Sequence, residues 1–236
     1  MKKIMFAAAA IAAGVAVAEG LVSSDIVGYA QNGLQEGATM VTPQFVPVAG
    51  STLNLTELVP TGDETSDNVF IQTLDPYGRT VDEYGWNDWA NDKACWVNDS
   101  YEPVTNVTFT TGQGLWVFGS TSTQGLQSAG KVGLNDIVVQ LQNGATGTGN
   151  PFPVELNLND IVPTGDDISD NVFIQTLDPY GRTLAEYGWN DWANDKACWV
   201  DDSYAPVTDV TFAPGQGLWI FGTSNAQYVQ FPAPEL

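Results

Sequence analysis

The chain has 236 residues, of which 28 are acidic, 7 are basic and none is histidine, so its formal net charge at pH 7 is −21. Such a chain repels nucleic acids and anionic lipids, and without histidine it has no Ser-His-Asp, Cys-His or His-ligated zinc arrangement. The hydrophobic content of 43% is enough to build a core, which excludes a disordered chain.

The first 18 residues have the pattern of a secretory signal peptide. Lys2 and Lys3 precede an apolar run that ends in Ala-Val-Ala at Ala18. The run is shorter than the roughly 20 apolar residues that span a bilayer. We therefore expect residues 1–18 to be removed and the protein to be secreted, or to lie at the cell surface or in a periplasm, with no membrane span left.

Downstream of this segment, the chain predicts short strands and tight turns. No stretch shows a sustained apolar period of 3.6 residues, whereas β-branched and aromatic runs are bounded by glycine, proline, asparagine and aspartate. A single helical turn, capped by Asn54 or Thr56, is expected in 53–63 before Pro60 and Gly62 end it. The expected strands, in chain order, are 26–31, 39–46, 68–75, 79–86, 93–99 and two in 107–119, with a turn at 75–78.

An internal repeat decides the predicted organisation. Residues 53–119 align with 156–222 at an offset of 103, and 54 of the 67 positions are identical. Upstream, 25–33 resembles 136–144 at an offset of 111, which makes the second copy eight residues shorter. The repeat has the length of one β-sandwich. We predict an all-β protein of two tandem, closely similar β-sandwich-like domains, 22–130 and 131–236, joined by a polar seam at 120–136; small β-barrels are the alternative.

Several segments together resemble a group of secreted, uncharacterised β-rich repeat proteins of verrucomicrobial and related bacteria. These segments are "SSDIVGYAQ" after the signal peptide, "GATMVTPQF", "PTGDETSDNVFIQTLDPYG", the tryptophan-rich hairpins and "GQGLWVFG". The resemblance covers most of each repeat. It implies export from a bacterium, and it implies no activity or site residues.

All eight tryptophans lie in the repeated block. Those in apolar strands are predicted to pack in the core: Trp96, Trp116, Trp199 and Trp219. The others sit in "YGWNDWAND", where exposed indole rings could stack on the C–H face of a sugar while carboxylates and amides bind its hydroxyls. The candidate ligand-binding residues are Trp86, Asp88, Trp89, Trp189, Asp191 and Trp192. The alternative is that one indole of each hairpin folds back onto the sandwich.

The acidic loops and the cysteines each allow two interpretations. Oxygen ligands that are spaced closely in a loop suit Ca²⁺. The candidate ligands are Asp63, Asp67, Asp166 and Asp170, although their spacing is not that of an EF-hand. A solvated acidic loop is the alternative, and no other cofactor or metal is expected.

Cys95 and Cys198 occupy equivalent positions in an apolar strand context. They favour two buried thiols over a disulfide, which would need Cα atoms within about 7 Å.

These patterns predict two functions of different classes. The first is a non-enzymatic structural component of a surface or matrix, whose partner is another copy of itself. The second is a bivalent carbohydrate-binding protein whose partner is a polysaccharide. We identify no catalytic residues and expect no enzyme. A pair of carboxylates could hydrolyse a glycoside, but an enzyme seldom needs two nearly identical copies of a small domain.

Overall fold

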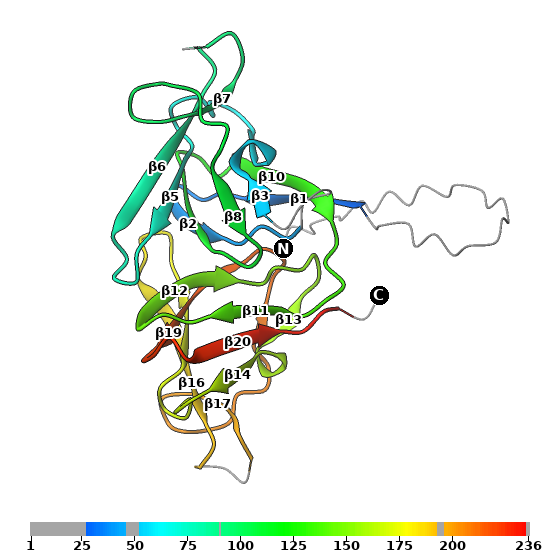
Figure 1. Cartoon of the computed structure of the whole chain (residues 1–236), viewed down its shortest axis with the longest axis vertical. Coiled ribbons are helices and arrows are strands. Elements are labelled where there is room, and N and C mark those ends of the chain that lie inside the picture. Colours follow the sequence, from blue (N-terminus) through cyan, green and yellow to red (C-terminus); the bar gives the residue numbers. More distant parts are fainter. Residues whose placement is uncertain (1–26, 46–51, 90, 193–195, 235–236) are drawn as a thin grey trace, which may run out of the picture.

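The computed structural model describes residues 27–45, 52–89, 91–192 and 196–234, and the segment interpreted as a signal peptide lies outside them. The described residues form strands and two single turns of 3₁₀ helix, so the predicted all-β class is confirmed. Figure 1 shows an elongated molecule whose first half lies at one end of the long axis and whose second half lies at the other.

The described residues of the first half form ten strands and one 3₁₀ turn. In chain order they are β1 (Val27–Gly33), β2 (Gly37–Val41), β3 (Thr52–Asn54), η1 (Leu55–Glu57), β4 (Val59–Thr61), β5 (Phe70–Leu74), β6 (Thr80–Asn87), β7 (Cys95–Val97), β8 (Thr108–Thr110), β9 (Leu115–Gly119) and β10 (Gly125–Lys131).

The second half holds the corresponding elements in the same order. They are β11 (Ile137–Gln140), β12 (Gly144–Gly149), β13 (Leu156–Asn157), η2 (Leu158–Asp160), β14 (Val162–Gly165), β15 (Phe173–Leu177), β16 (Thr183–Asn190), β17 (Cys198–Val200), β18 (Thr211–Phe212), β19 (Gly217–Gly222) and β20 (Gln227–Phe231).

Three antiparallel sheets build each half. A five-stranded sheet has the order β2-β9-β5-β6-β7 in the first half and β12-β19-β15-β16-β17 in the second. Three-stranded sheets (β1-β10-β4 and β11-β20-β14) and two-stranded sheets (β3-β8 and β13-β18) complete the halves. No sheet of the described residues closes on itself, so the small-barrel alternative is wrong.

The core of each half lies between the five-stranded sheet and the smaller sheets. In the first half it joins Ile71 and Trp96 from the large sheet to Leu53, Phe109 and Leu126 from the small ones. The Trp96 indole is fully buried and donates its N–H to the Leu58 carbonyl at 2.7 Å. The second half repeats the arrangement, with Trp199 donating to Ile161 at 2.8 Å.

The predicted helical turn is confirmed as η1. Its cap is Asn54, whose side chain accepts from the Thr56 N–H, while the Glu57 carboxylate accepts from the Asn54 N–H. This reciprocal arrangement is a capping box. It explains how a single turn persists between two strands.

Two details of the predicted organisation are corrected. The seam contains β10, the central strand of a sheet, so it is not a linker. The upstream alignment at an offset of 111 is also wrong. Leu34 and Leu141 are the equivalent positions, because both are buried and donate their N–H groups to Gln124 and Gln227, which themselves lie 103 residues apart. The motif "LQEGAT" therefore matches "LQNGAT" at an offset of 107.

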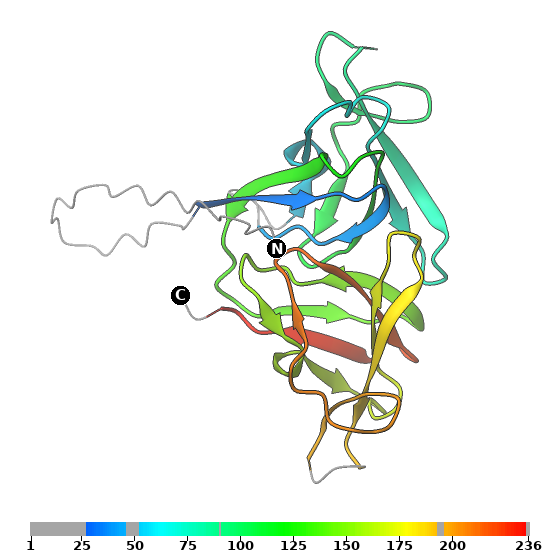
Figure 2. The same cartoon turned by 180° about the vertical axis from the view of Figure 1, so that it is seen from behind.

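The two halves meet along their edge strands β2 and β12. The Ala38 N–H donates to the Pro179 carbonyl and the Ala145 N–H donates to the Pro76 carbonyl, each at 2.9 Å. Because both alanines occupy equivalent strands and both prolines occupy equivalent turns, the contact is reciprocal, as across a two-fold axis. Figures 1 and 2 show the β5–β6 and β15–β16 hairpins extending from the two halves toward this junction.

Cys95 and Cys198 lie in β7 and β17, at opposite ends of the molecule (Figure 1). Neither is in a disulfide, and both are half-buried rather than fully buried. Their separation excludes a bridge within the chain.

Candidate functional site

The exposed tryptophan of the first half is held by the carboxylate of Asp67. This residue has a left-handed backbone (φ 58°), and its N–H donates to the Trp86 carbonyl. One carboxylate oxygen accepts from the Asn87 side chain at 2.9 Å, and the other accepts from the Trp89 indole N–H at 2.5 Å. The polar edge of Trp89 is thereby fixed, while 63% of the residue remains exposed.

The second half repeats this arrangement. Asp170 is left-handed (φ 57°) and accepts from Asn190 at 2.8 Å and from the Trp192 indole N–H at 2.5 Å. Trp192 is also 63% exposed. The loop geometry is thus independent of the residues that differ between the two copies.

A tyrosine stands beside each exposed tryptophan. The ring centroids of Trp89 and Tyr101 are 5.3 Å apart, and those of Trp192 and Tyr204 are 5.5 Å apart, with tilts of 45° and 46°. Both tyrosines are 50% exposed. We call Trp89 with Tyr101, and Trp192 with Tyr204, the terminal aromatic pairs.

A tight turn positions Tyr101 in its left-handed conformation (φ 59°). The Tyr101 N–H donates to the Asn98 carbonyl, and the Asn98 side chain accepts from the N–H groups of Ser100 and Glu102 at 3.0 Å each. In the second half Asp201 takes the role of Asn98. The sequence analysis did not select these tyrosines, although "DSY" follows the same strand in both copies.

The other tryptophan of each hairpin turns inward. Trp86 packs edge-to-face on Trp96, with centroids 5.3 Å apart, and is half-buried. Trp189 packs likewise on Trp199 and is 8% exposed. The candidate residues Trp86 and Trp189 therefore do not face solvent as a flat strip with Trp89 and Trp192, and the fold-back alternative is the observed arrangement.

The candidate acids of the hairpins remain close to the exposed rings. Asp88 and Asp191 follow β6 and β16 directly, are exposed, and donate their backbone N–H groups to Ser66 and Ser169 at 3.1 Å. Their carboxylates lie one residue before the exposed tryptophans. Asp88 and Asp191 are therefore the residues that directly precede the exposed tryptophans, and both are exposed to solvent.

The candidate calcium ligands are engaged in the loop itself. Both carboxylate oxygens of Asp67 and of Asp170 accept N–H groups, as described above. The backbone carbonyls of Asp63 and Asp166 accept from the side chains of Gln124 and Gln227 at 3.1 Å. In the part of the chain that the structure describes, no three His, Cys, Asp or Glu side chains come together to hold a metal ion.

Trp116 and Trp219 occupy a different environment from the one predicted. Both are half-buried and neither belongs to the core of its half. They project from the outer face of the five-stranded sheets, opposite Gln72 and Gln175 on the neighbouring strands. Their prediction as core residues is wrong.

The turn at Asp75 lowers the pKa of the Asp75 carboxyl. The backbone N–H of Arg79 is the largest cause that lowers the Asp75 pKa, helped by the Arg79 side chain and the Tyr77 N–H. The guanidinium also forms an ion pair with Asp75 at 2.6 Å and lies over the Tyr77 ring. In the second half, burial acts to raise the pKa of the Asp178 carboxyl. The hydrogen bonds from Arg182 act in the opposite direction, and the Asp178 pKa is lowered.

Comparison of the chain with models of protein families, with curated proteins and with solved structures gives no match in any of the three. Within the described ranges, no helix is long and apolar enough to cross a membrane.

The terminal aromatic pairs present exposed aromatic faces whose indole edges are fixed by hydrogen bonds. Tryptophan and tyrosine supply large contact areas at a low cost in conformational entropy, because each side chain has two rotatable torsions. Here the indole is further fixed by its hydrogen bond to a carboxylate. Such a surface can bind a flat, amphipathic ligand without being reordered.

Proposed function

We propose that the protein is an exported, non-enzymatic component of a bacterial surface or matrix that binds carbohydrate polymers at both of its ends. The observation that carries this proposal is the presence of two terminal aromatic pairs with the same geometry, one in each half. In this proposal each half is one binding domain, and the structural role consists of joining two polymer segments.

The chemistry of the pairs fits a sugar ring. An indole ring offers an apolar face to the C–H groups of a pyranose, and its polar edge stays hydrogen-bonded elsewhere. Asp88 and Asp191 offer acceptors for hydroxyl groups at the rim. A net charge of −21 favours a neutral polymer over an acidic one.

The positions of the pairs fit bivalent binding. The β6–β7 and β16–β17 hairpins lie at opposite ends of the long axis (Figure 1), so the two pairs can engage separate chains or distant segments of one surface. Two linked weak sites then reinforce each other, because the second binding event takes place at a high effective concentration.

Retention on crystalline cellulose and crystalline chitin tests the proposal. The crystals of both polymers have flat faces that exposed aromatic rings can contact. We expect the wild-type protein to be retained on at least one of the two polymers. The single variants Trp89→Ala and Trp192→Ala should each be retained at least about 10²-fold less, because avidity is lost. The double variant should not be retained. Tyr29→Ala removes a 60% exposed ring from β1 and should be retained like the wild type.

Three outcomes bear against this proposal. Equal retention of the wild-type and double-variant proteins, with equal melting temperatures, would show that the terminal aromatic pairs are not the binding sites, whereas no retention of the wild-type protein on either polymer would leave the purely structural hypothesis with self-assembly. Retention that disappears in EDTA would show that a metal ion is required, whereas we expect no effect, since the Asp67 and Asp170 carboxylates already accept two N–H groups each.

A further inference from the structure

Three cavities lie side by side along the junction of the two halves. Two of them have volumes of about 540 Å³ and 560 Å³ and share Leu74, Ala145 and Trp219. The third shares Pro76 with the second, and Gln140 and Gln142 with the first. We call these three adjoining hollows together the junction groove; each of the two larger ones has the size of a small-molecule site.

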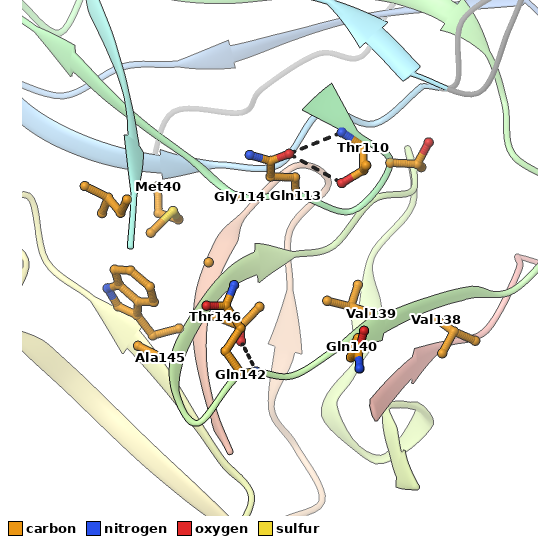
Figure 3. A pocket seen from close by; sticks show the side chains of 14 residues that line it. Met40, Thr110, Gln113, Gly114, Val138, Val139, Gln140, Gln142, Ala145 and Thr146 are labelled. Carbon is orange, nitrogen blue, oxygen red and sulfur yellow. Dashed lines mark hydrogen bonds between the residues drawn. The ribbon is translucent and has the colours of Figure 1, made fainter. Parts of the chain in front are cut away.

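The groove is built by both halves together. Figure 3 shows the first part, with Thr110 and Gln113 of the first half facing Val139, Gln140 and Gln142 of the second. In the second part, Gln72, Leu74, Gly78 and Trp116 are matched by Gln175, Leu177, Gly181 and Trp219 at the offset of 103. A single copy would supply half of each wall.

The indole rings of the groove have polar neighbours held in place. The Gln72 amide donates to Glu83 and accepts from the Thr80 hydroxyl at 2.9 Å. The Gln175 amide donates to Glu186 and accepts from Thr183 at 3.0 Å. Since a primary amide has two N–H donors and two lone pairs, each glutamine retains the capacity to donate once and accept once more.

Among the residues that the structure describes, no charged side chain lines any of the three cavities. Because the chain has 28 acidic residues, the lack of charged side chains distinguishes this lining from the rest of the chain. The polar side chains of the lining carry threonine hydroxyls, the Tyr77 hydroxyl, and glutamine and asparagine amides. These groups suit uncharged hydroxyls, and the groove offers no counter-charge to an ionic ligand.

The backbone at the junction is already engaged, which disfavours an added peptide strand. The β2 strand pairs with β9 on one side, and its other edge donates the N–H groups of Ala38 and Thr42 to Pro179 and Gly215 at 2.9 Å. The β12 strand pairs with β19, and the Ala145 N–H and the Gly147 carbonyl on its other edge bind the first half. A peptide that binds by strand addition needs such groups to be open.

We propose that the junction groove binds one neutral, unbranched oligosaccharide segment per chain, with Trp116 and Trp219 as stacking surfaces. This site is separate from the terminal aromatic pairs, and it requires both copies of the repeat. Duplication of the chain would therefore create a site that neither copy has alone.

Isothermal titration calorimetry of the full chain with cellohexaose, xylohexaose, mannohexaose and maltohexaose tests the proposal. Trp89→Ala with Trp192→Ala removes the terminal pairs, and we expect this variant to bind at least one hexaose with a stoichiometry of one. Trp116→Ala with Trp219→Ala should weaken that binding at least tenfold. Tyr29→Ala, which removes an exposed aromatic ring from β1 outside the lining, should not.

Gln72→Ala with Gln175→Ala provides a second groove variant that keeps both indoles, in case the double tryptophan variant does not melt cooperatively. It too should weaken binding at least tenfold. The proposal is overturned if the variant without terminal pairs binds none of the four hexaoses, if folded groove variants bind them like the wild type, or if hexagalacturonate or an uncharged Gly-Ser-Thr hexapeptide binds as well as the neutral sugars.

The two proposals fail separately. If only the terminal pairs bind sugar, the wild-type stoichiometry is two and the variant without pairs is inactive. If only the groove binds, the wild-type stoichiometry is one and the Trp89 and Trp192 changes have no effect in solution or on crystalline polymers.

Discussion

The tryptophans of each half differ in the face of the sheet from which they project. Trp86 and Trp96 are directly paired across β6 and β7 and point into the core, as do Trp189 and Trp199. Trp116 and Trp219 point to the outer face, and Trp89 and Trp192 lie beyond the strand ends. The same residue type therefore serves packing, the junction and the exposed ends.

The two tryptophans of one hairpin should differ sharply in their contribution to stability. Trp189→Ala should lower the free energy of unfolding by roughly 3–5 kcal/mol, because it empties a space in the core. Trp192→Ala should cost no more than about 1 kcal/mol, since the ring is exposed and one hydrogen bond is lost. Chemical denaturation measures both, and similar costs for the two variants would contradict the assigned burial.

The Asp75 pKa should respond only partly to removal of the Arg79 charge. In Arg79→Gln the backbone N–H, the largest cause of the lowered pKa, is kept, while the ion pair is lost. An NMR titration of the Asp75 carboxyl should therefore give a pKa between the wild-type value and the ordinary one. A return to the ordinary value would show that the guanidinium dominates.

The sign of the linked stability effect follows from the direction of that shift. Because the folded-state pKa is below the unfolded value of about 3.9, the contribution of Asp75 to stability is present above about pH 4. It is lost as the pH falls through the folded-state pKa.

At the scale of elements, glycines allow the edge strands of the two halves to touch. A Cβ atom on Gly217 of β19 would lie 2.1 Å from Met40 Cγ and 2.5 Å from the Met40 carbonyl carbon. A Cβ on Gly114 would lie 2.7 Å from the Gly147 backbone. The second glycine of "GQG" is thus required by close packing at the junction in both copies.

Gly217→Ala should therefore destabilise the protein by about 1–3 kcal/mol, because the added methyl overpacks β2. Differential scanning calorimetry should show a lower melting temperature. Gly33→Ala is the matched control, since its Cβ would meet nothing within 4 Å. Equal melting temperatures for the two variants would contradict the close approach of β2 and β19.

At the scale of the whole molecule, the halves have complete sheets of their own and share the junction. Each strand pairing of β11–β20 lies within residues 137–231. The junction adds the reciprocal bonds of Ala38 and Ala145 and covers part of Trp116 and Trp219. Separating the halves would expose the outer faces of both large sheets.

Residues 131–236 should fold alone but melt below the full chain. The internal core of Trp199, Phe152 and Phe231 supports folding, and loss of the junction removes stabilising contacts. Far-UV circular dichroism and a thermal melt of the fragment measure both expectations. A disordered spectrum would show that the halves are not independent domains.

The sequence by itself determined the all-β class, the turn at Asp75, the single helical turn near Asn54 and the sequence repeat. These features depend on short-range physics: turn residues, capping side chains and alternation along a strand act over a few positions. The burial of Trp96 was also predicted from its neighbours, whereas the sequence did not distinguish Trp89 from Trp86.

Only the tertiary structure decided which faces of the strands are covered. Alternation divides a strand into two faces but does not say which face another element will bury, so Trp116 and Trp96 looked alike in sequence. Tyr101 meets Trp89 through a separate turn, and the junction groove joins residues about a hundred positions apart. Such contacts depend on how the sheets pack, which no local pattern specifies.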